Sequence, residues 1–184
     1  MTKEEKEIER REDLRERNIS LILDSYNEIF SDFDPRHYSE KALSDDFLSE
    51  IKRASRDKGE GVELKFLAPK SRRNLNEEVL IRRRLREHFK KHFLGLKKEK
   101  KRTIKQGFYF VLAGIFFMFI ATLILFRYKT ESLVTSFLVV FLEPAGWFSF
   151  WEGLDLIIFD SKKINPELVF YRKMSKADII FKSY

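Results

Sequence analysis

Hydrophobic positions are distributed unevenly along the chain, and the longest uninterrupted stretch lies past its middle. Residues 107–126 read GFYFVLAGIFFMFIATLILF and contain no charge. At about 1.5 Å per residue, a helix of this length spans about 30 Å, the thickness of the hydrocarbon core of a bilayer. A buried helix of a soluble protein seldom lacks a polar face over such a length. We therefore predict a transmembrane helix at 107–126.

A second apolar stretch follows after a gap of only six residues, 127–132. Residues 133–151 read LVTSFLVVFLEPAGWFSFW, and apolar positions continue to residue 159. Because the gap is short, we predict a transmembrane hairpin over 107–159 whose two helices are antiparallel and in contact. Small side chains on the first span favour close packing, although they form no Gly-xxx-Gly motif. These small residues are Gly107, Ala113, Gly114, Ala121 and Thr122.

Basic residues beside the predicted spans indicate how the hairpin is oriented. Residues 82–105 contain twelve Lys or Arg against two acids, in a chain whose formal net charge is +7. More basic residues follow the second span, and basic residues near span ends favour the cytoplasmic side. We therefore predict a multi-pass protein of the cell membrane with both termini cytoplasmic and 127–132 outside. Trp147 and Trp151 would then belong to an aromatic cluster at the cytoplasmic interface.

The rest of the chain predicts a small α+β domain. Alternating apolar positions predict strands at 19–24, 62–67 and 177–181. The third strand should return to the sheet of the first two, because two strands alone are only marginally stable. Ser25 and Glu28 have the spacing of a capping box, which predicts a short helical turn after Ser25.

Three further helical segments are predicted. No Pro interrupts the helical periodicity of 74–126, so we expect one long helix that runs from water into lipid. Ser44 begins a shorter helix that should end at 57–59. Asn165 and Pro166 begin the last helix, with Pro in the first turn. Its expected apolar side consists of Leu168, Val169 and Tyr171.

The predicted fold is an α+β cytoplasmic domain, with a small sheet of two or three strands and helices, joined through a long helix to a two-helix transmembrane hairpin. Its parts are a charged, flexible or frayed N-terminus (1–17), the cytoplasmic domain with the long basic helix (18–106), the hairpin (107–159, with spans at 107–126 and 133–151) and a cytoplasmic C-terminal helix and strand (160–184).

Several kinds of chemistry are disfavoured by composition. The chain has no Cys, which excludes disulfides, zinc–thiolate sites and Cys nucleophiles. It shows no Gly-rich phosphate loop and no nucleophile elbow, so we expect neither an enzyme nor a cofactor. His88 and His92 are four residues apart, a spacing that suits metal ligands. No third ligand is evident nearby, and we expect no metal site.

Glu143 is the most informative polar residue. It lies about ten residues into the second span and directly precedes Pro144. A charged side chain at the centre of a bilayer costs about 2.5–3.5 kcal/mol on insertion scales. Glu143 could therefore serve an ion pathway, a proton-binding site or a bond between subunits. Alternatively, it fixes helix packing through a hydrogen bond to Thr122 or another span residue.

Two more acids lie at the end of the second span. Glu152 and Asp155 are three residues apart and share one helix face. If the membrane ends near Trp151, they lie in the headgroup region. There they could pair with bases at the foot of the first span. These bases are Lys101, Arg102 and Lys105.

The basic segment before the first span has three interpretations: it sets topology, binds anionic lipid headgroups or a protein partner, or binds nucleic acid. Nucleic-acid binding would require aromatic residues interleaved on a groove. Phe89 and Phe93 instead share the apolar helix face, which favours topology and lipid, at about 1 kcal/mol per basic residue near a surface. The expected contacts are Lys97, Lys98, Lys100, Lys101, Arg102 and Lys105.

Two motifs resemble those of an uncharacterised bacterial family of two-span membrane proteins. One is the turn Ile29-Phe30-Ser31-Asp32-Phe33-Asp34-Pro35 with Leu43 and Asp45-Asp46, and the other is Gly146-Trp147, Trp151, Asp155 and Phe159-Asp160. The resemblance covers about 19–180 and implies a strand, a turn, an acidic helix start, a second strand and a basic helix before two spans. The family has no assigned activity, so the resemblance implies architecture alone.

These observations predict a membrane-anchored scaffold or regulatory subunit that binds a partner or anionic lipid at the cytoplasmic face. The alternative is an oligomeric cation channel or transporter component with Glu143 in the pathway. A single two-helix hairpin cannot enclose a path, so the alternative requires a homo-oligomer or a protein partner.

Overall fold

The computed structural model describes residues 18–59, 61–128 and 132–184. The predicted flexible N-terminus (1–17) lies outside the described residues. The chain forms two compact units. The first comprises the described residues up to Leu94 together with Leu168–Tyr184, and the second is Gly95–Glu167. The described chain is mostly helical, with one small sheet.

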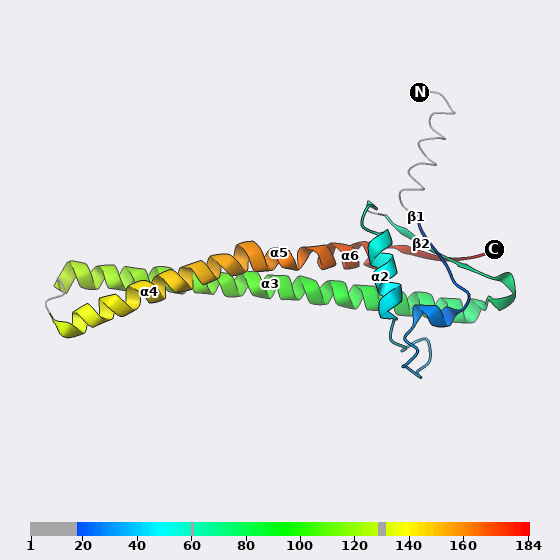
Figure 1. The fold of residues 1–184 in the computed structure, drawn as a ribbon, viewed down its shortest axis with the longest axis horizontal. Coiled ribbons are helices and arrows are strands. Elements are labelled where there is room, and N and C mark those ends of the chain that lie inside the picture. Colours follow the sequence, from blue (N-terminus) through cyan, green and yellow to red (C-terminus); the bar gives the residue numbers. More distant parts are fainter. Residues whose placement is uncertain (1–17, 60, 129–131) are drawn as a thin grey trace, which may run out of the picture. The chain divides into compact units, whose positions relative to one another are not determined.

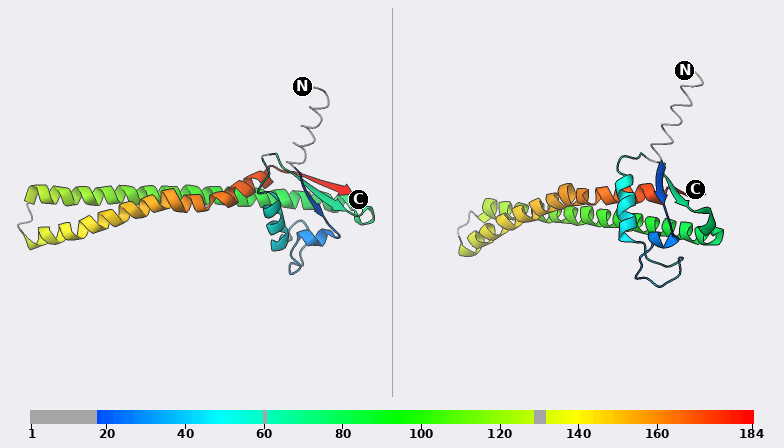
Figure 2. Two further views of the ribbon diagram at one scale, coloured as in Figure 1. Left: turned by 45° about the horizontal axis from the view of Figure 1, so that its top comes forward. Right: turned by 45° about the vertical axis from the view of Figure 1, so that its right-hand side comes forward.

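The first unit contains a three-stranded parallel sheet in the order β1-β2-β3. Its strands lie side by side in Figure 2. All three predicted strands are confirmed, and the last one joins the sheet as expected. Alternate side chains of the central strand are buried, which is the pattern of a strand with one face on the core. The strands are β1 (Asn18–Ile22), β2 (Glu63–Ala68) and β3 (Asp178–Ser183).

Short capped elements follow β1. The 3-10 helix η1 (Tyr26–Ile29) confirms the predicted capping box, with the Ser25 N–H donating to Glu28 Oε1 at 3.0 Å. Helix α2 (Asp45–Ala54) begins after Ser44 as predicted, but it ends about one turn before 57–59. The segment after α2 is tied to another helix, because the Lys173 ammonium donates to the carbonyls of Ser55 and Lys58.

A single helix of 54 residues, α3 (Leu75–Tyr128), confirms the predicted long helix. It follows the 3-10 turn η2 (Lys70–Arg72), and Asn74 caps its start by accepting the N–H of Asn76 at 3.1 Å. The part of α3 in the first unit places Ile81, Leu85 and Phe89 in the core, each 0% exposed. Figure 1 shows α3 running from the sheet as one continuous ribbon.

Helix α6 (Asn165–Ser175) returns the chain to β3. The prediction of its apolar side was correct only in part: Tyr171 packs against the core, but Val169 is 39% exposed, and the buried residues are Phe170 and Met174. Residues 168–171 are all apolar or aromatic and point to different sides of the helix, so contacts with the core decide which of them is buried. Phe170 and Met174 are four residues apart and therefore share the face toward the core.

The second unit contains two helices that are long and apolar enough to cross a membrane, the apolar part of α3 and a helix over Leu133–Lys163. The latter consists of α4 (Leu133–Asp155), a π-helical turn η3 (Leu156–Asp160) and α5 (Ser161–Lys163). The helix therefore continues well beyond the predicted span end at residue 151. No Pro occurs between Pro144 and Pro166 to stop it, and the π-turn accommodates an extra residue without a break.

Candidate functional site

The two apolar helices of the second unit touch through their backbones. Gly114 faces Gly146: a Cβ atom added to Gly114 would lie 2.7 Å from the Gly146 carbonyl oxygen and 2.6 Å from the Phe150 nitrogen. Gly107 faces Gly153 in the same way, with a Cβ on Gly107 only 2.7 Å from the Gly153 carbonyl oxygen. These pairs run in opposite chain directions, so the helices are antiparallel. Figure 1 shows them side by side.

The four glycines form a glycine seam, Gly107, Gly114, Gly146 and Gly153, with a spacing of seven residues on each helix. Ala121 and Val139 are buried one repeat further along. Small residues at such positions let helix backbones approach closely, which is how apolar helices associate in lipid. The sequence analysis missed Gly146 and Gly153 in this role because it searched for a four-residue repeat. The seven-residue repeat was the available signal.

Glu143 does not face the seam. Its side chain lies on the exposed surface of α4 and makes no hydrogen bond or ion pair with any residue the structure describes. The predicted bond to Thr122 is not formed, because the Thr122 hydroxyl donates to the carbonyl of Met118 in its own helix, at 2.9 Å. Counting three residues from the Gly114–Gly146 pair places Glu143 level with Phe117. That level is the middle of the apolar stretch 107–126.

Aromatic and acidic residues lie together near the end of α4. The rings of Trp147 and Trp151 are stacked, with centroids 6.0 Å apart. Trp151, Glu152 and Asp155 line an open hollow of about 330 Å³. Apolar and aromatic side chains therefore surround two carboxylates, an arrangement that suits the boundary between lipid and water. The other lining residues are Phe148, Leu154, Ile158 and Phe159.

The basic segment of α3 is mostly exposed, but its predicted ion pairs with the acids are not formed. Within the described part of the chain, no ion pair joins Glu152 or Asp155 to Lys101, Arg102 or Lys105. Lys105 instead lies over the Tyr109 ring, 5.6 Å from its centroid. Lys100 is half-buried and donates to Asn165 Oδ1 at 2.6 Å. Among the six predicted contacts, the exposed bases are Lys97, Lys98, Lys101, Arg102 and Lys105.

His88 and His92 lie together on α3 in the first unit. Their ring centroids are 4.2 Å apart, and His92 stacks on Tyr171 of α6 at 5.0 Å. Burial, followed by the neighbouring His92, lowers the pKa of His88 from 6.5 to about 4. Nε2 of His88 is buried and has no hydrogen-bond partner among the described residues. No group of three potential metal ligands occurs within 18–59, 61–128 and 132–184.

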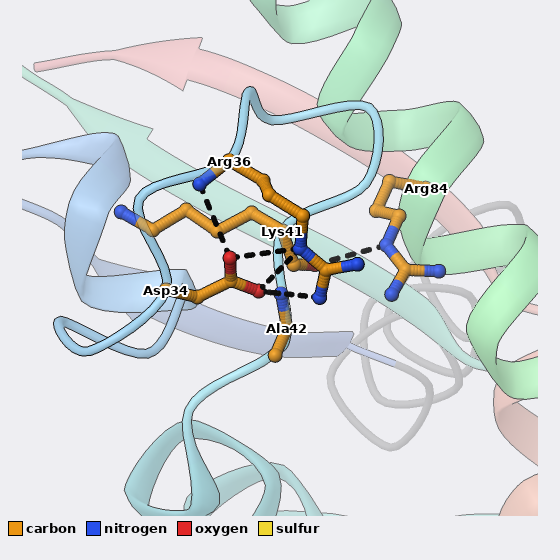
Figure 3. Close-up of polar contacts among 5 residues, drawn as sticks. All are labelled: Asp34, Arg36, Lys41, Ala42 and Arg84. Atoms are coloured by element: carbon orange, nitrogen blue, oxygen red, sulfur yellow. Dashed lines mark hydrogen bonds and ion pairs between the residues drawn. The ribbon is translucent and has the colours of Figure 1, made fainter.

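The loop between η1 and α2 is held by one carboxylate (Figure 3). Asp34 accepts bonds from the Arg36 guanidinium at 2.7 and 2.9 Å and from the Ala42 N–H at 2.7 Å. The Arg36 guanidinium holds the pKa of Asp34 well below its usual range. Arg84 of α3 donates to the Lys41 carbonyl at 2.9 Å, which ties the loop to the long helix. The loop presents Phe33, which is 98% exposed.

A buried polar cluster fixes the start of α3, and the sequence analysis did not identify it. Glu78 is only 2% exposed, and the Arg73 guanidinium donates to both of its carboxylate oxygens, at 2.8 and 2.9 Å. The Tyr26 hydroxyl also donates to Glu78, at 2.9 Å, and accepts the N–H of Asn74 at 3.1 Å. Burial opposes ionisation of Glu78, but the bonds from Arg73 and Tyr26 outweigh it and lower the pKa.

No protein-family model, curated protein or solved structure matches this chain.

Proposed function

We propose that this protein is a membrane-anchored scaffold or regulatory subunit, with a helical hairpin in the cell membrane and its α+β unit at the cytoplasmic face. The observation that carries this proposal is the change of surface along α3 at about Gly107. Before this point the exposed side chains are mainly basic, and after it they are large and apolar. Phe116 is 58% exposed and Phe119 is 59% exposed. A soluble protein rarely exposes so long an apolar surface, whereas lipid would cover it.

The sheet supports placing both ends of the hairpin on one side of the membrane. Strands β2 and β3 are hydrogen-bonded neighbours, yet both apolar helices lie between them in the sequence. If these helices cross a bilayer, the chain must therefore cross an even number of times. The basic residues beside Gly107 and at Lys162 and Lys163 favour the cytoplasm as that side.

The exposed bases of α3 suit anionic lipid headgroups. Each base near a negatively charged membrane surface contributes about 1 kcal/mol, and the attraction decreases with salt. In bilayers with labelled phosphatidylserine, the protein should concentrate this lipid around itself. Replacing Lys97, Lys98, Lys101 and Arg102 by Gln should abolish the enrichment. The matched control replaces the same number of exposed bases in the first unit, Arg53, Arg56, Lys70 and Lys182, and should leave it unchanged.

Membrane anchoring itself is tested by alkaline carbonate extraction of membranes from cells that make the full chain. The protein should remain in the pellet, and a variant with Phe116 and Phe119 replaced by Asp should be released. Orientation is tested with single cysteines, since the chain has none. Lys129→Cys should react only from outside, and Lys162→Cys only from the cytoplasm. Release of the unmodified protein by carbonate would contradict the anchor, and the opposite labelling would contradict the orientation.

A second candidate function is an oligomeric cation channel or transporter component. It is favoured by the position of Glu143, which is level with the middle of α3's apolar stretch and exposed on α4. Rings of acidic side chains favour cations. Cation flux into proteoliposomes that is lost in Glu143→Gln, with assembly unchanged, would place this function ahead of the scaffold.

A further inference from the structure

We propose that the α4 surface around Glu143 is the contact with a second copy of this chain. The two α4 helices would pack in parallel about a two-fold axis along the membrane normal, so that the two Glu143 carboxyl groups meet and share a proton. This inference rests on the proposed insertion of the hairpin into a bilayer.

The surface is a second seam on α4, distinct from the glycine seam. Positions 140, 143 and 147 are separated by steps of three and four residues, which places them along one stripe of a helix. Val140 is 70% exposed and Trp147 is 55% exposed, and Glu143, between them, is exposed as well. These three side chains are therefore uncovered within the described chain, while the glycine seam is filled by α3. We call them the Glu143 stripe: Val140, Glu143 and Trp147.

Lipid is a poor neighbour for the Glu143 stripe, because Glu143 would lie deep in the bilayer. The register of the glycine seam places Glu143 level with Phe117, which would lie near the middle of the hydrocarbon core if the hairpin crosses a bilayer. Acids at this depth are expensive and almost always face protein or a wet cavity. Within the described chain Glu143 has no partner, and the nearest candidate from the sequence, Thr122, is bonded to its own helix. Another molecule can supply a partner for Glu143 at this depth.

A second copy supplies that partner at the correct depth. A two-fold axis brings each residue of the stripe against the same surface of the other copy, as in the isologous interfaces of most homodimers. One protonated carboxyl donates to the other, which accepts, so the pair carries one negative charge instead of two. A hydrogen bond between two carboxyl groups requires a proton on one of them, because a carboxylate has no donor. Trp147 adds a large flat ring next to the carboxyl pair.

The test measures dimerisation of the full chain in liposomes at low protein-to-lipid ratio, by single-molecule photobleaching. The unmodified protein should show two-step bleaching. Glu143→Gln keeps a donor and an acceptor and should change the dissociation constant less than threefold. Glu143→Leu has a similar volume but no hydrogen bond and should weaken the dimer about tenfold, in line with about 1–2 kcal/mol for a bond between membrane helices. Phe141→Leu, on the opposite side of α4, is the matched control and should have no effect.

Cross-linking identifies the surface independently of affinity. A single cysteine at Val140 should give disulfide-linked dimers in the bilayer, and one at Phe141 should not. Carbonate-resistant protein that is monomeric, or dimers that are insensitive to Glu143→Leu, would overturn the inference while leaving the membrane anchor intact. Assemblies larger than two, or cross-links to a different protein, would overturn the two-fold contact. Release of the protein by carbonate would instead remove the proposed anchor on which the inference rests.

Discussion

The two units of this protein pack their elements together with opposite kinds of residue. The first unit fills its core with large rings, and Phe30, Phe66 and Phe89 are at most 2% exposed. The second unit brings two helices together where side chains are missing, at the glycine seam. In water, burial of apolar area drives the contact. Between apolar helices in lipid this driving force is absent, and close backbone approach takes its place. The contrast is the one expected if the first unit is in water and the second in a bilayer.

The two units also differ in how an acidic side chain is satisfied. Glu78 in the first unit is buried, and Arg73 and Tyr26 satisfy it within the chain. Glu143 in the second unit is exposed and has no partner among the described residues. A buried charge in a soluble core must find its partners locally. If α4 lies in a bilayer, an acid on its outer surface can be satisfied by a group from another molecule, so the two positions would have different consequences for assembly.

The largest effect is expected from Phe66→Ala in the central strand. The Phe66 ring is fully buried and lies 5.1 Å from the Phe181 ring and 5.9 Å from the Phe47 ring, centroid to centroid. Loss of transfer energy and the cavity left behind should destabilise the first unit by about 3–5 kcal/mol. Hydrogen exchange of the β2 and β3 amides measures this loss. Amides of α4 should keep their protection, and equal loosening of both units would show that they unfold as one.

A smaller effect is expected from Gly114→Ala in the glycine seam. The new methyl group would meet the backbone of α4 at 2.6–2.9 Å, so one helix must shift. Such overpacking typically costs about 1–3 kcal/mol. Thermal unfolding in detergent can be followed by tryptophan fluorescence, because the only two tryptophans, Trp147 and Trp151, are both on α4. An unchanged or higher midpoint would contradict the described backbone contact.

The pH dependence of the first unit should change modestly in His88→Gln. Because the pKa of His88 is about 4 when folded and 6.5 when unfolded, the unfolded chain binds the proton more readily, and stability falls as pH falls from 6.5 toward 4. Arg84, Lys91 and His92 oppose the added charge, and Tyr171 of α6 lies against it. Between pH 7 and pH 5 the loss should be on the order of 1 kcal/mol after allowance for partial exposure.

The comparison is made by urea unfolding at pH 7 and pH 5, read by hydrogen exchange in the first unit. Asp34 contributes little to this difference. Its pKa is lowered in the folded protein, so its contribution to stability is lost only when the pH falls below the usual pKa of an Asp carboxyl group, well under pH 5. An identical pH 5 loss in His88→Gln would exclude His88 as the source.

The smallest effect is expected from Gly95→Ala, which matches the substitution in the seam on the same helix. A Cβ atom added to Gly95 meets nothing within 4 Å. Without a clash, only helix propensity remains, and Ala should stabilise α3 by about 0.5–1 kcal/mol. If Gly95→Ala stabilises the protein and Gly114→Ala destabilises it, the loss at Gly114 comes from the contact in the glycine seam and not from helix propensity. A loss at Gly95 would show that this part of α3 has contacts beyond those described.

Local pattern was sufficient to predict much of the fold. The strands, the capping box at Ser25 and the long helix α3 depend on periodicity and capping, which are properties of neighbouring residues, and all were confirmed. The parallel order of the strands could not be predicted, because alternation reveals which face is buried but not which strand lies beside it. The buried side of α6 was predicted only in part, for a similar reason: when several apolar residues follow one another, tertiary contacts decide which of them is buried.

In the candidate site, too, local features were predicted and long-range contacts were not. The sequence predicted that Glu152 and Asp155 share one helix face because they are three residues apart, and in the structure both line the hollow at the end of α4. Contacts that join distant segments were missed. Arg84 reaches the Lys41 carbonyl, and Tyr26 reaches Glu78, across 43 and 52 residues of sequence. The direction in which Glu143 points depends on which face of α4 the glycines occupy, and that required the register between two helices.

The position of β3 also has a consequence for how the protein is made. About 110 residues separate the end of β2 at Ala68 from the start of β3 at Asp178. At a translation rate of about 5–20 residues per second, the ribosome needs about 5–22 seconds to synthesise this interval. During that time both apolar helices emerge, while β2 has an open edge and the core lacks Phe181. An open strand edge invites pairing with other chains. The β2 edge that pairs with β3 therefore stays unpaired until the end of the chain is synthesised.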